Sequence, residues 1–196
     1  MGGLQLSLFG AAAPSFDAGF RGLSRTELAG GAWIDHRAGW LDGSDRLYAE
    51  LAASLAWKAE RRVMYDREVD VPRLVSWFEP GAAPPLLLAM GAALSARYGA
   101  VLDRVSANWY RDGNDSVAWH RDQIGRERPE SIVGIVSLGE PRGFMVRPHG
   151  GGASRSWTLG RGDLVVLGGT IQVHHEHCVP KAKSAGPRIS VMFRHG

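Results

Sequence analysis

The stretch SIVGIVSLGEPRGFMVRP, residues 131–148, contains two short apolar segments separated by a turn that begins at Gly139. Apolar segments of this length, bounded by glycine and proline, are typical of β-strands. The same pattern recurs on both sides of this stretch, and we expect further strands at 104–110, 116–120, 154–159, 163–169, 171–179 and 188–195. Eight short strands at close spacing predict a β-sandwich or a jelly-roll barrel.

Two segments of the N-terminal half have helical patterns instead. In residues 44–62, Ser44 can cap a helix, and leucines recur every four residues from Leu47 to Leu55. Residues 83–99 carry prolines where a first helical turn would lie and end at a glycine, as helices often do. We therefore predict two helices in this half of the chain.

The remaining N-terminal segments predict extended structure. Residues 27–41 indicate a short strand and a turn, and residues 63–78 indicate loop and extended chain around Pro72. With the strands that follow residue 100, these elements predict an α+β fold in which two helices pack on an all-β core.

The length and composition indicate one globular domain. The chain has 196 residues, of which 44% are hydrophobic, and it contains no apolar run long enough for a membrane-spanning helix. We expect a flexible Gly/Ala-rich tail at 1–18 and a single domain at 19–196. Within that domain, a lid and the helices would occupy 19–100 and the jelly-roll core 101–196.

The N-terminus and the cysteine content indicate the cellular compartment. The opening MGGLQLSLFG has no basic region and no long apolar core, so we expect no signal peptide. The single cysteine, Cys178, excludes an intrachain disulfide and suits a reducing cytoplasm. A net charge of +3 is compatible with a polyanionic partner.

A metal site is indicated by the segment WHRDQ and by a cluster of histidines further along the chain. His120 and Asp122 are two positions apart, so on a strand their side chains share a face. One more histidine from a distant strand would complete a facial triad of two histidines and one carboxylate, which suits non-haem Fe(II) oxygenases. The segment QVHHEHCVPK offers His174, His175 and His177 as the third ligand.

Two arginines of the last predicted strand indicate a bound anion. Arg188 and Arg194 are six residues apart, an even offset that places both on one face of a strand. In a barrel interior, two guanidinium groups need anions, and a dicarboxylate together with an acidic metal ligand could supply them. The alternative is a pair of surface arginines on an edge strand.

Four segments resemble, in order and spacing, the AlkB family of Fe(II)/2-oxoglutarate dioxygenases. They are NWYRDGNDSVAWHRD, SIVGIVSLGEPRGFMVRP, GDLVVLGGTIQVHHEHCVPK and GPRISVMFR, and the resemblance covers residues 60–196. It implies a double-stranded β-helix with Fe(II) held by His120, Asp122 and His177. It also implies 2-oxoglutarate, with O₂ as cosubstrate, bound by Asn108, Tyr110, Arg188, Ser190 and Arg194.

The same resemblance implies a different role for each of the three clustered histidines. His177, in the segment HCVP, stands at the family's ligand position. His175 would share its face and lie toward the mouth of the cavity, whereas His174 would point to the opposite face and have a structural or surface role.

The activity that the resemblance implies is oxidative demethylation of N-alkylated bases in DNA or RNA by a monomeric protein. A stacked base cannot reach a buried metal, so it must be flipped out or single-stranded. We expect Tyr65 and His175 to sandwich the base. Phosphate contacts would come from arginines around the mouth, namely Arg73, Arg121, Arg126, Arg128, Arg142 and Arg147. Ile124 stands where well-studied repair members carry an acidic residue, which puts the preference for a cationic base in question.

The N-terminal segment QLSLF resembles the short peptide by which bacterial repair proteins bind the sliding clamp. Leu8 and Phe9 would fill an apolar pocket, while Gln5 hydrogen-bonds at its rim and Leu6 lies between them. The alternative is an N-terminal strand that covers the core.

Two other classes of function are compatible with the same residues. One is an oxygenase that acts on a protein, a lipid or a small molecule, and the absence of an arginine-rich rim would favour it. The other is a non-catalytic cupin-like module that binds a metal or ligand. The pair Arg188 and Arg194 argues against this module, because a bare metal site needs no dicarboxylate clamp.

Overall fold

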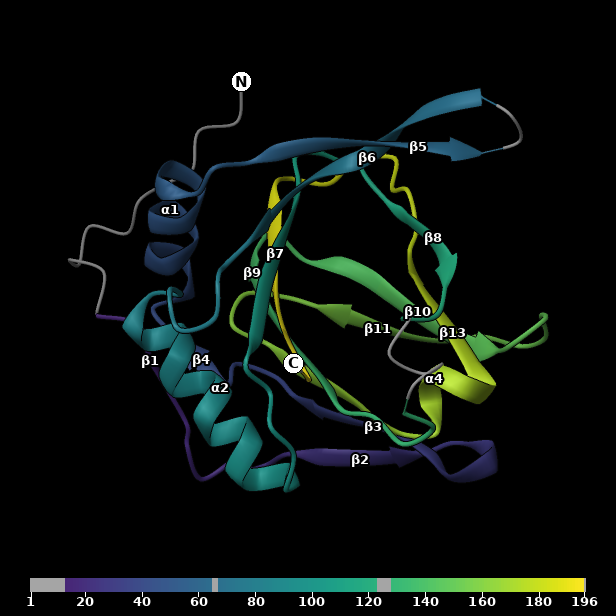
Figure 1. The fold of residues 1–196 in the computed structure, drawn as a ribbon, viewed down its shortest axis with the longest axis horizontal. Coiled ribbons are helices and arrows are strands. Elements are labelled where there is room, and N and C mark those ends of the chain that lie inside the picture. The colour runs from purple at the N-terminus through teal and green to yellow at the C-terminus, as the bar shows by residue number, and fades with distance from the viewer. Residues whose placement is uncertain (1–12, 65–66, 123–127, 196) are drawn as a thin grey trace.

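The computed structural model describes residues 13–64, 67–122 and 128–195, with only the backbone path described for the strand residues between 61 and 70 (Figure 1). Two helices, α1 (Ser44–Ser54) and α2 (Pro85–Tyr98), lie on one side of a large sheet, and a smaller sheet faces its other side. This arrangement confirms the predicted α+β class. No helix of the described part of the chain is long and apolar enough to cross a membrane.

Within the described residues the large sheet has eight antiparallel strands. In spatial order they are β2 (Ser24–Glu27), β3 (Ala32–Arg37), β12 (Leu164–Gly169), β9 (Val133–Gly139), β14 (Arg188–Arg194), β7 (Arg104–Tyr110), β6 (Arg67–Trp77) and β5 (Lys58–Met64). The smaller sheet has the order β11 (Arg155–Leu159), β10 (Arg142–Pro148), β13 (His175–Val179) and β8 (Val117–His120). A short pair, β1 (Ser15–Phe16) and β4 (Leu41–Asp42), completes the strands that the structure describes.

The eight strands expected after residue 100 are the strands β7 to β14. Each sheet holds four of them, as in a jelly roll: β7, β14, β9 and β12 lie in the large sheet, and β8, β13, β10 and β11 lie in the small one. Apolar side chains such as Ile135, Phe144 and Val165 fill the space between the sheets. The predicted jelly-roll core is therefore present.

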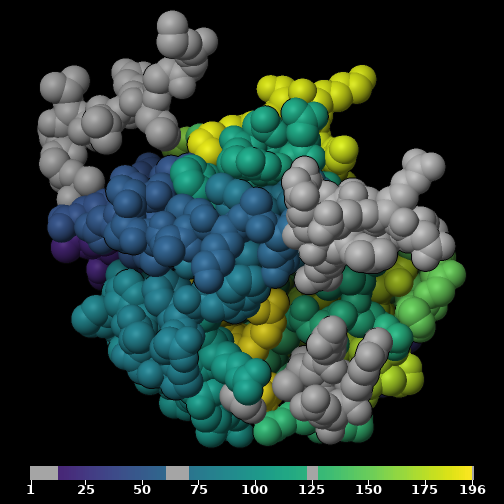
Figure 2. Space-filling model, turned by 45° about the horizontal axis from the view of Figure 1, so that its top comes forward, coloured from purple at the N-terminus to yellow at the C-terminus, as the bar shows by residue number. Residues whose placement is uncertain are grey.

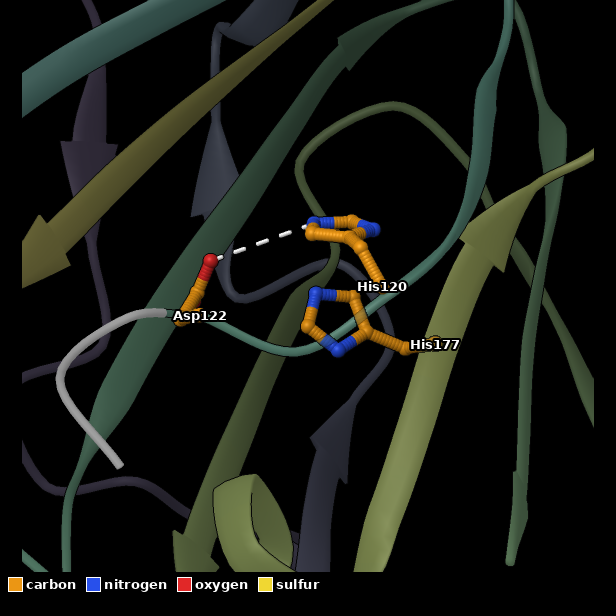
Figure 3. A group of neighbouring side chains, drawn as sticks. All are labelled: His120, Asp122 and His177. Carbon is orange, nitrogen blue, oxygen red and sulfur yellow. Dashed lines mark ion pairs between the residues drawn. The ribbon is translucent and has the colours of Figure 1, made fainter. Parts of the chain in front are cut away.

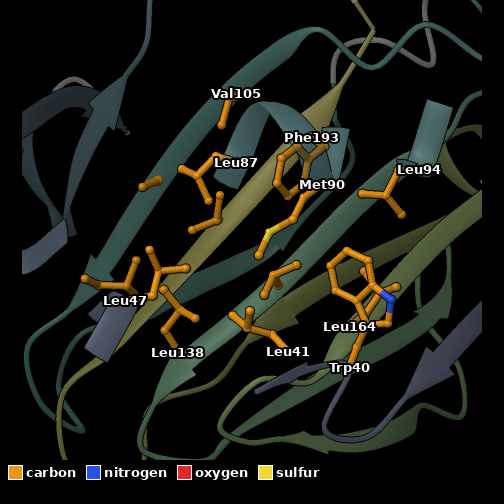
Figure 4. Close-up of a cluster of buried hydrophobic side chains, with 14 of the residues drawn as sticks. Trp40, Leu41, Leu47, Leu87, Met90, Leu94, Val105, Leu138, Leu164 and Phe193 are labelled. Atoms are coloured by element: carbon orange, nitrogen blue, oxygen red, sulfur yellow. The ribbon is translucent and has the colours of Figure 1, made fainter. Parts of the chain in front are cut away.

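The outer face of the large sheet packs against the helices (Figure 4). Leu87, Met90 and Leu94 of α2 are fully buried against Phe193 of β14. Helix and sheet approach closely because β9 carries a glycine: a Cβ at Gly134 would lie 2.9 Å from a Leu94 methyl carbon. Odd-numbered residues of β14 therefore face the helices, and its even-numbered residues face the smaller sheet.

The predicted helix at 44–62 is wrong in its second half. Helix α1 ends at Ser54, Leu55 has an extended backbone, and residues 58–64 form strand β5. Strand β5 pairs with β6 along its length, and this tertiary pairing outweighs the local helical pattern.

The prediction of loop and extended chain at 63–78 is right in its extended part only, because residues 67–77 form one long strand, β6. Pro72 is tolerated in it because the pairing with β5 shifts register between Ala59 and Arg61, opposite that proline. The Pro72 carbonyl accepts a hydrogen bond from the backbone N–H of Ser116 at 2.8 Å. This contact ties β6 to the segment that enters β8.

The sheet extends beyond the predicted core at 101–196. Strand β3 pairs with β12, and β6 pairs with β7, so the N-terminal half contributes strands to both edges of the large sheet. Within the predicted tail at 1–18, Ser15 and Phe16 form strand β1. The segment 171–179 begins as a helical turn, α4 (Ile171–His174), and only then becomes strand β13.

Candidate metal centre

Two strands of the smaller sheet bring the three predicted metal ligands together (Figure 3). His120 ends β8 and lies directly opposite His177 in the pairing of β8 with β13, and Asp122 follows two residues later. The two imidazole rings are 4.2 Å apart between centroids, and one ligand atom from each of the three residues lies within 4.8 Å of the others. Two imidazoles and one carboxylate on one side of a cavity are a donor set that Fe(II) accepts.

The protonation states of the three side chains suit metal binding. Burial, reinforced by nearby His120, lowers the pKa of His177 to about 3, so its ring is neutral near pH 7. Burial would raise the pKa of Asp122, but the charge of Arg194 and the two histidines hold it below its usual range. The Nδ1 atom of His120 lies 2.9 Å from the carbonyl oxygen of Ala118, which fixes the ring and leaves Nε2 toward Asp122.

The predicted 2-oxoglutarate residues lie on two neighbouring strands that face the cavity. In the pairing of β7 with β14, Tyr110 is opposite Arg188 and Asn108 is opposite Ser190. Arg194, further along the same face of β14, contacts Asp122, with 3.4 Å between Nε and Oδ2. The even spacing of these residues along each strand explains why all of them point inward.

Arg188 provides the test of whether a dicarboxylate fits. Its side chain is only 2% exposed, and its Nη2 donates to the hydroxyl of Ser137 at 2.7 Å. Its Nε and Nη1 atoms have no hydrogen-bond partner within the described part of the chain. A buried guanidinium with unused donors calls for an anion, and a carboxylate matches its planar fork. The residues present therefore fit 2-oxoglutarate.

A cavity of about 650 Å³ joins the ligands to the predicted cosubstrate residues. Figure 2 shows a hollow on this side of the molecule, with yellow residues of the C-terminal strands recessed between teal and green segments. The cavity is lined by residues predicted to bind the metal, 2-oxoglutarate and phosphate. They are Arg73, Asn108, Tyr110, His120, Arg121, Asp122, His177, Arg188, Ser190 and Arg194.

Three of the arginines predicted to bind phosphate have other positions. Arg142 is buried and donates to the carbonyls of Asp112, Asp115 and Pro180, so it joins two loops and is not at the mouth. Arg147 forms an ion pair with Glu176 at 2.5 Å and stacks on Trp119. Arg128 lies beside His195 in a separate surface hollow. The burial of Arg142 contradicts the phosphate role that the sequence predicted for it.

Replacing Arg142 is therefore expected to reduce stability. An Arg142→Met variant loses three charge-assisted hydrogen bonds and leaves their carbonyl acceptors buried, so the free energy of unfolding should fall by about 2–4 kcal/mol. Chemical denaturation would measure this loss. The exposed Arg46 pairs with Glu50 one helical turn away, and Arg46→Met serves as a control with an expected loss of about 0.3–0.5 kcal/mol. Equal losses in the two variants would contradict the structural role of Arg142.

The other two histidines of the cluster do not line the cavity among the residues that the structure describes. His175 is 6% exposed, too buried to stack on a base as the resemblance implied. His174 is exposed, as a surface role requires, but it ends helix α4 and does not lie on a strand.

Several predicted residues lie outside the described part of the chain. They are Tyr65, predicted to contact the base; Ile124, which replaces the family's acidic residue; Arg126, predicted to contact phosphate; and the predicted clamp-binding residues Gln5, Leu6, Leu8 and Phe9. Their roles stay predictions.

Two residues of the site were missed by the sequence analysis. Trp77 is 58% exposed and lines the cavity from the end of β6. Trp77 and Arg73 are four residues apart, so they share a face of β6, but this signal is visible only when residues 67–77 are known to form a strand. Gln172 lies in α4 and hydrogen-bonds to Asp122, a contact that no sequence spacing indicates.

Comparison with known proteins agrees with this geometry. The model of the 2OG-Fe(II) oxygenase superfamily matches residues 48–194. The chain is 27% identical over 198 residues to the bovine (Bos taurus) alpha-ketoglutarate-dependent dioxygenase alkB homolog 3, covering 88% of this chain and 66% of that relative. It is 29% identical over 119 residues to the human (Homo sapiens) DNA oxidative demethylase ALKBH2, covering 56% of this chain and 46% of the relative.

Two solved structures share the fold. The structure of OsALKBH1 has a TM-score of 0.61 at 13% identity, covering 88% of this chain and all of that one. A 2OG-Fe(II) family oxidoreductase from Burkholderia pseudomallei has a TM-score of 0.52 at 15% identity, covering 76% of each chain.

The chain belongs to the 2OG-Fe(II) oxygenase superfamily. Within it, the chain is similar to AlkB homologues, of whose length it spans about two thirds or less. The family defines an oxidative dioxygenase with Fe(II) and 2-oxoglutarate as cofactors, and the triad of His120, Asp122 and His177 is consistent with the iron site.

Proposed function

We propose that this protein oxidatively removes alkyl groups from ring nitrogens of bases in DNA, and in RNA as the alternative substrate. The observation that supports it best is the combination of a facial triad, an arginine with unused donors and an exposed tryptophan in one cavity. The named activity of relatives such as the DNA oxidative demethylase ALKBH2 supports the choice of substrate.

In the proposed reaction one O₂ oxidises two molecules. 2-Oxoglutarate loses CO₂ and becomes succinate, and the N-methyl carbon gains the other oxygen atom and leaves as formaldehyde, so that N–CH₃ becomes N–H. Bound Fe(II) would supply the oxidation by activating O₂, with His120, Asp122 and His177 as its protein ligands.

The protein's own residues would bind, orient and exclude water. Arg188 would hold the distal carboxylate of 2-oxoglutarate through its unused donors, supported from behind by Ser137. Arg194 would balance the charge of Asp122, which it already contacts. Because Arg188 and His177 are buried, little water would reach this end of the cavity, and this would strengthen the binding of a carboxylate by Arg188.

The mouth of the cavity suits a flat, polyanion-linked substrate. Trp77 offers an exposed aromatic face on which a flipped or single-stranded base can stack. Arg73 and Arg121 line the same cavity and would contact neighbouring phosphates. These features support a nucleic-acid base over an aliphatic substrate.

A succinate-release assay tests this proposal. With Fe(II) and 2-oxoglutarate present, we expect methylated DNA or RNA oligonucleotides to increase succinate formation well above that with unmethylated strands. If no methylated oligonucleotide stimulates turnover but a peptide, lipid or small molecule does, the substrate class is wrong while the oxygenase chemistry stands.

The tryptophan has its own testable consequence. Stacking of one base on an aromatic side chain contributes about 1–3 kcal/mol, so Trp77→Ala should weaken binding of a methylated oligonucleotide by about 5- to 150-fold. Fluorescence anisotropy at fixed salt would measure this change, and Trp77→Phe should retain most of the affinity. The KM for 2-oxoglutarate should stay unchanged, because the tryptophan lies away from the Arg188 end. Unchanged oligonucleotide affinity in Trp77→Ala would exclude the stacking role.

We also propose that the segment QLSLF docks the enzyme on the bacterial sliding clamp. The double variant Leu8→Ala/Phe9→Ala should lose clamp binding in a pull-down and keep full activity on free oligonucleotides. Loss of activity or of folding in that variant would show instead that the segment belongs to the core.

A further inference from the structure

Gln172 is a buried amide in the short helix α4, between strands β12 and β13. It lies 50 residues from Asp122 in sequence, is 2% exposed, and is not among the described residues that line the cavity. We propose that Gln172 is a positioning residue that orients the carboxylate of Asp122 for metal binding. This inference rests on the proposed metal site and adds a residue to its function.

One amide group contacts both the backbone and the side chain of the ligand. The backbone N–H of Asp122 donates to Oε1 of Gln172 at 2.8 Å, and Nε2 of Gln172 lies 3.5 Å from Oδ2 of Asp122. Arg121 adds a third tie, because its Nη1 donates to the carbonyl of Val173 at 3.0 Å. Two successive residues of α4, Gln172 and Val173, therefore hydrogen-bond to two successive residues that follow β8, Arg121 and Asp122.

The hydrogen bonds to Gln172 hold Asp122 just beyond the point where the pairing of β8 with β13 ends. Strand β8 ends at His120, and the last residue pair between β8 and β13 joins His120 to His177. Asp122 lies beyond that pair, so among the described residues no sheet hydrogen bond fixes its backbone. The hydrogen bond to Gln172 supplies the missing constraint, which is the general role of the groups that surround metal ligands.

The contacts also distinguish the two oxygens of the carboxylate. Oδ2 is approached by Nε2 of Gln172 and by Nε of Arg194, the latter at 3.4 Å. Oδ1 is the oxygen that faces His120, with 3.9 Å to its Nε2. Two donors on Oδ2 therefore leave Oδ1 directed toward His120. Gln172 does this as a neutral group, while Arg194 provides the charge.

Metal titration of the purified, metal-free protein tests this role independently of turnover. Co(II) is the probe, because its visible absorption bands report both affinity and ligand geometry. Gln172→Met keeps a similar side-chain volume and removes both hydrogen bonds, so the Co(II) dissociation constant should rise by about 10- to 100-fold with altered bands. Gln172→Glu keeps an acceptor for the Asp122 N–H but places a second carboxylate beside Oδ2, and it should weaken binding similarly.

Thr170→Ala is the matched control from the same turn. The Thr170 hydroxyl donates to the carbonyl of Gly30 and not to the ligand segment, so this variant should bind Co(II) as the wild type does. Thermal unfolding of the metal-free proteins shows whether each variant is folded. If Gln172→Met is unfolded, Gln172→Glu decides the question.

The outcomes separate this inference from the metal site itself. Wild-type affinity and bands in the folded Gln172 variants would overturn the positioning role. A fall in affinity in Thr170→Ala as large as in Gln172→Met would also overturn it, because loosening α4 would then suffice. If His177→Ala binds Co(II) as well as the wild type, the proposed metal centre is wrong, whatever the Gln172 variants do.

Discussion

Replacing His177 by alanine is expected to abolish metal binding and the turnover of 2-oxoglutarate. His177 is buried, faces His120 across the β8–β13 pair and has a pKa of about 3, so its neutral ring is available as a ligand at physiological pH. Removing one of three ligands leaves an incomplete facial triad that cannot hold the metal in the cavity. Calorimetric titration with a divalent metal and a succinate assay would both measure the loss.

The neighbouring histidine provides the matched control. His174 is exposed at the end of helix α4, and it does not line the cavity in the described structure. His174→Ala should retain metal affinity and turnover close to those of the wild type. Equal losses in folded His174→Ala and His177→Ala proteins would refute the ligand assignment.

The second large effect is expected at Arg188. Charge-assisted hydrogen bonds contribute about 1.5–3 kcal/mol, so Arg188→Ala should raise the dissociation constant of 2-oxoglutarate by about 10- to 150-fold. Arg188→Lys keeps a positive charge but loses the planar fork, and its effect should be smaller. Binding of 2-oxoglutarate to the metal-loaded protein, measured by calorimetry, would rank the three proteins.

A surface arginine controls for the loss of charge. Arg161 is about half exposed, pairs with Glu140 and Asp45, and is not among the described residues that line the cavity. Arg161→Ala should leave 2-oxoglutarate binding unchanged. An unchanged dissociation constant in Arg188→Ala would remove the dicarboxylate clamp from the mechanism.

Face alternation explains why so much of the centre could be predicted from the sequence. Strands have a side-chain period of two, so the offsets from Asn108 to Tyr110 and from Arg188 to Arg194 already place these residues on shared faces. The apolar strands β9 and β14 bury both faces between the helices and the smaller sheet, and this makes their positions easy to recognise.

The N-terminal strands were harder to predict because their local patterns indicate other structures. Residues 58–62 were included in the predicted helix, yet they pair with β6, in which Pro72 made part of the strand resemble a loop. The contacts of Gln172 and Arg142, in contrast, depend on loops 50 and about 30 residues away, and no local periodicity indicates such contacts.

Fewer of the arginines predicted to bind phosphate line the cavity, among the residues that the structure describes, than the sequence suggested. Arg142 is buried and Arg147 is paired with Glu176, which leaves Arg73 and Arg121 as the predicted arginines that line the cavity in the described structure. A small number of phosphate contacts predicts a shallow dependence of oligonucleotide affinity on salt. With few phosphate contacts, Trp77 would contribute a larger share of the binding energy for the substrate.

The intact mass of a methylated oligonucleotide tests the central proposal most directly. After incubation with the enzyme, Fe(II), 2-oxoglutarate and O₂, a strand that carries 1-methyladenine should lose the mass of one CH₂ group as N–CH₃ becomes N–H. The change should require 2-oxoglutarate and should be absent with His177→Ala. Unchanged masses across a panel of N-methylated DNA and RNA strands, while 2-oxoglutarate is still converted to succinate, would contradict nucleic-acid demethylation.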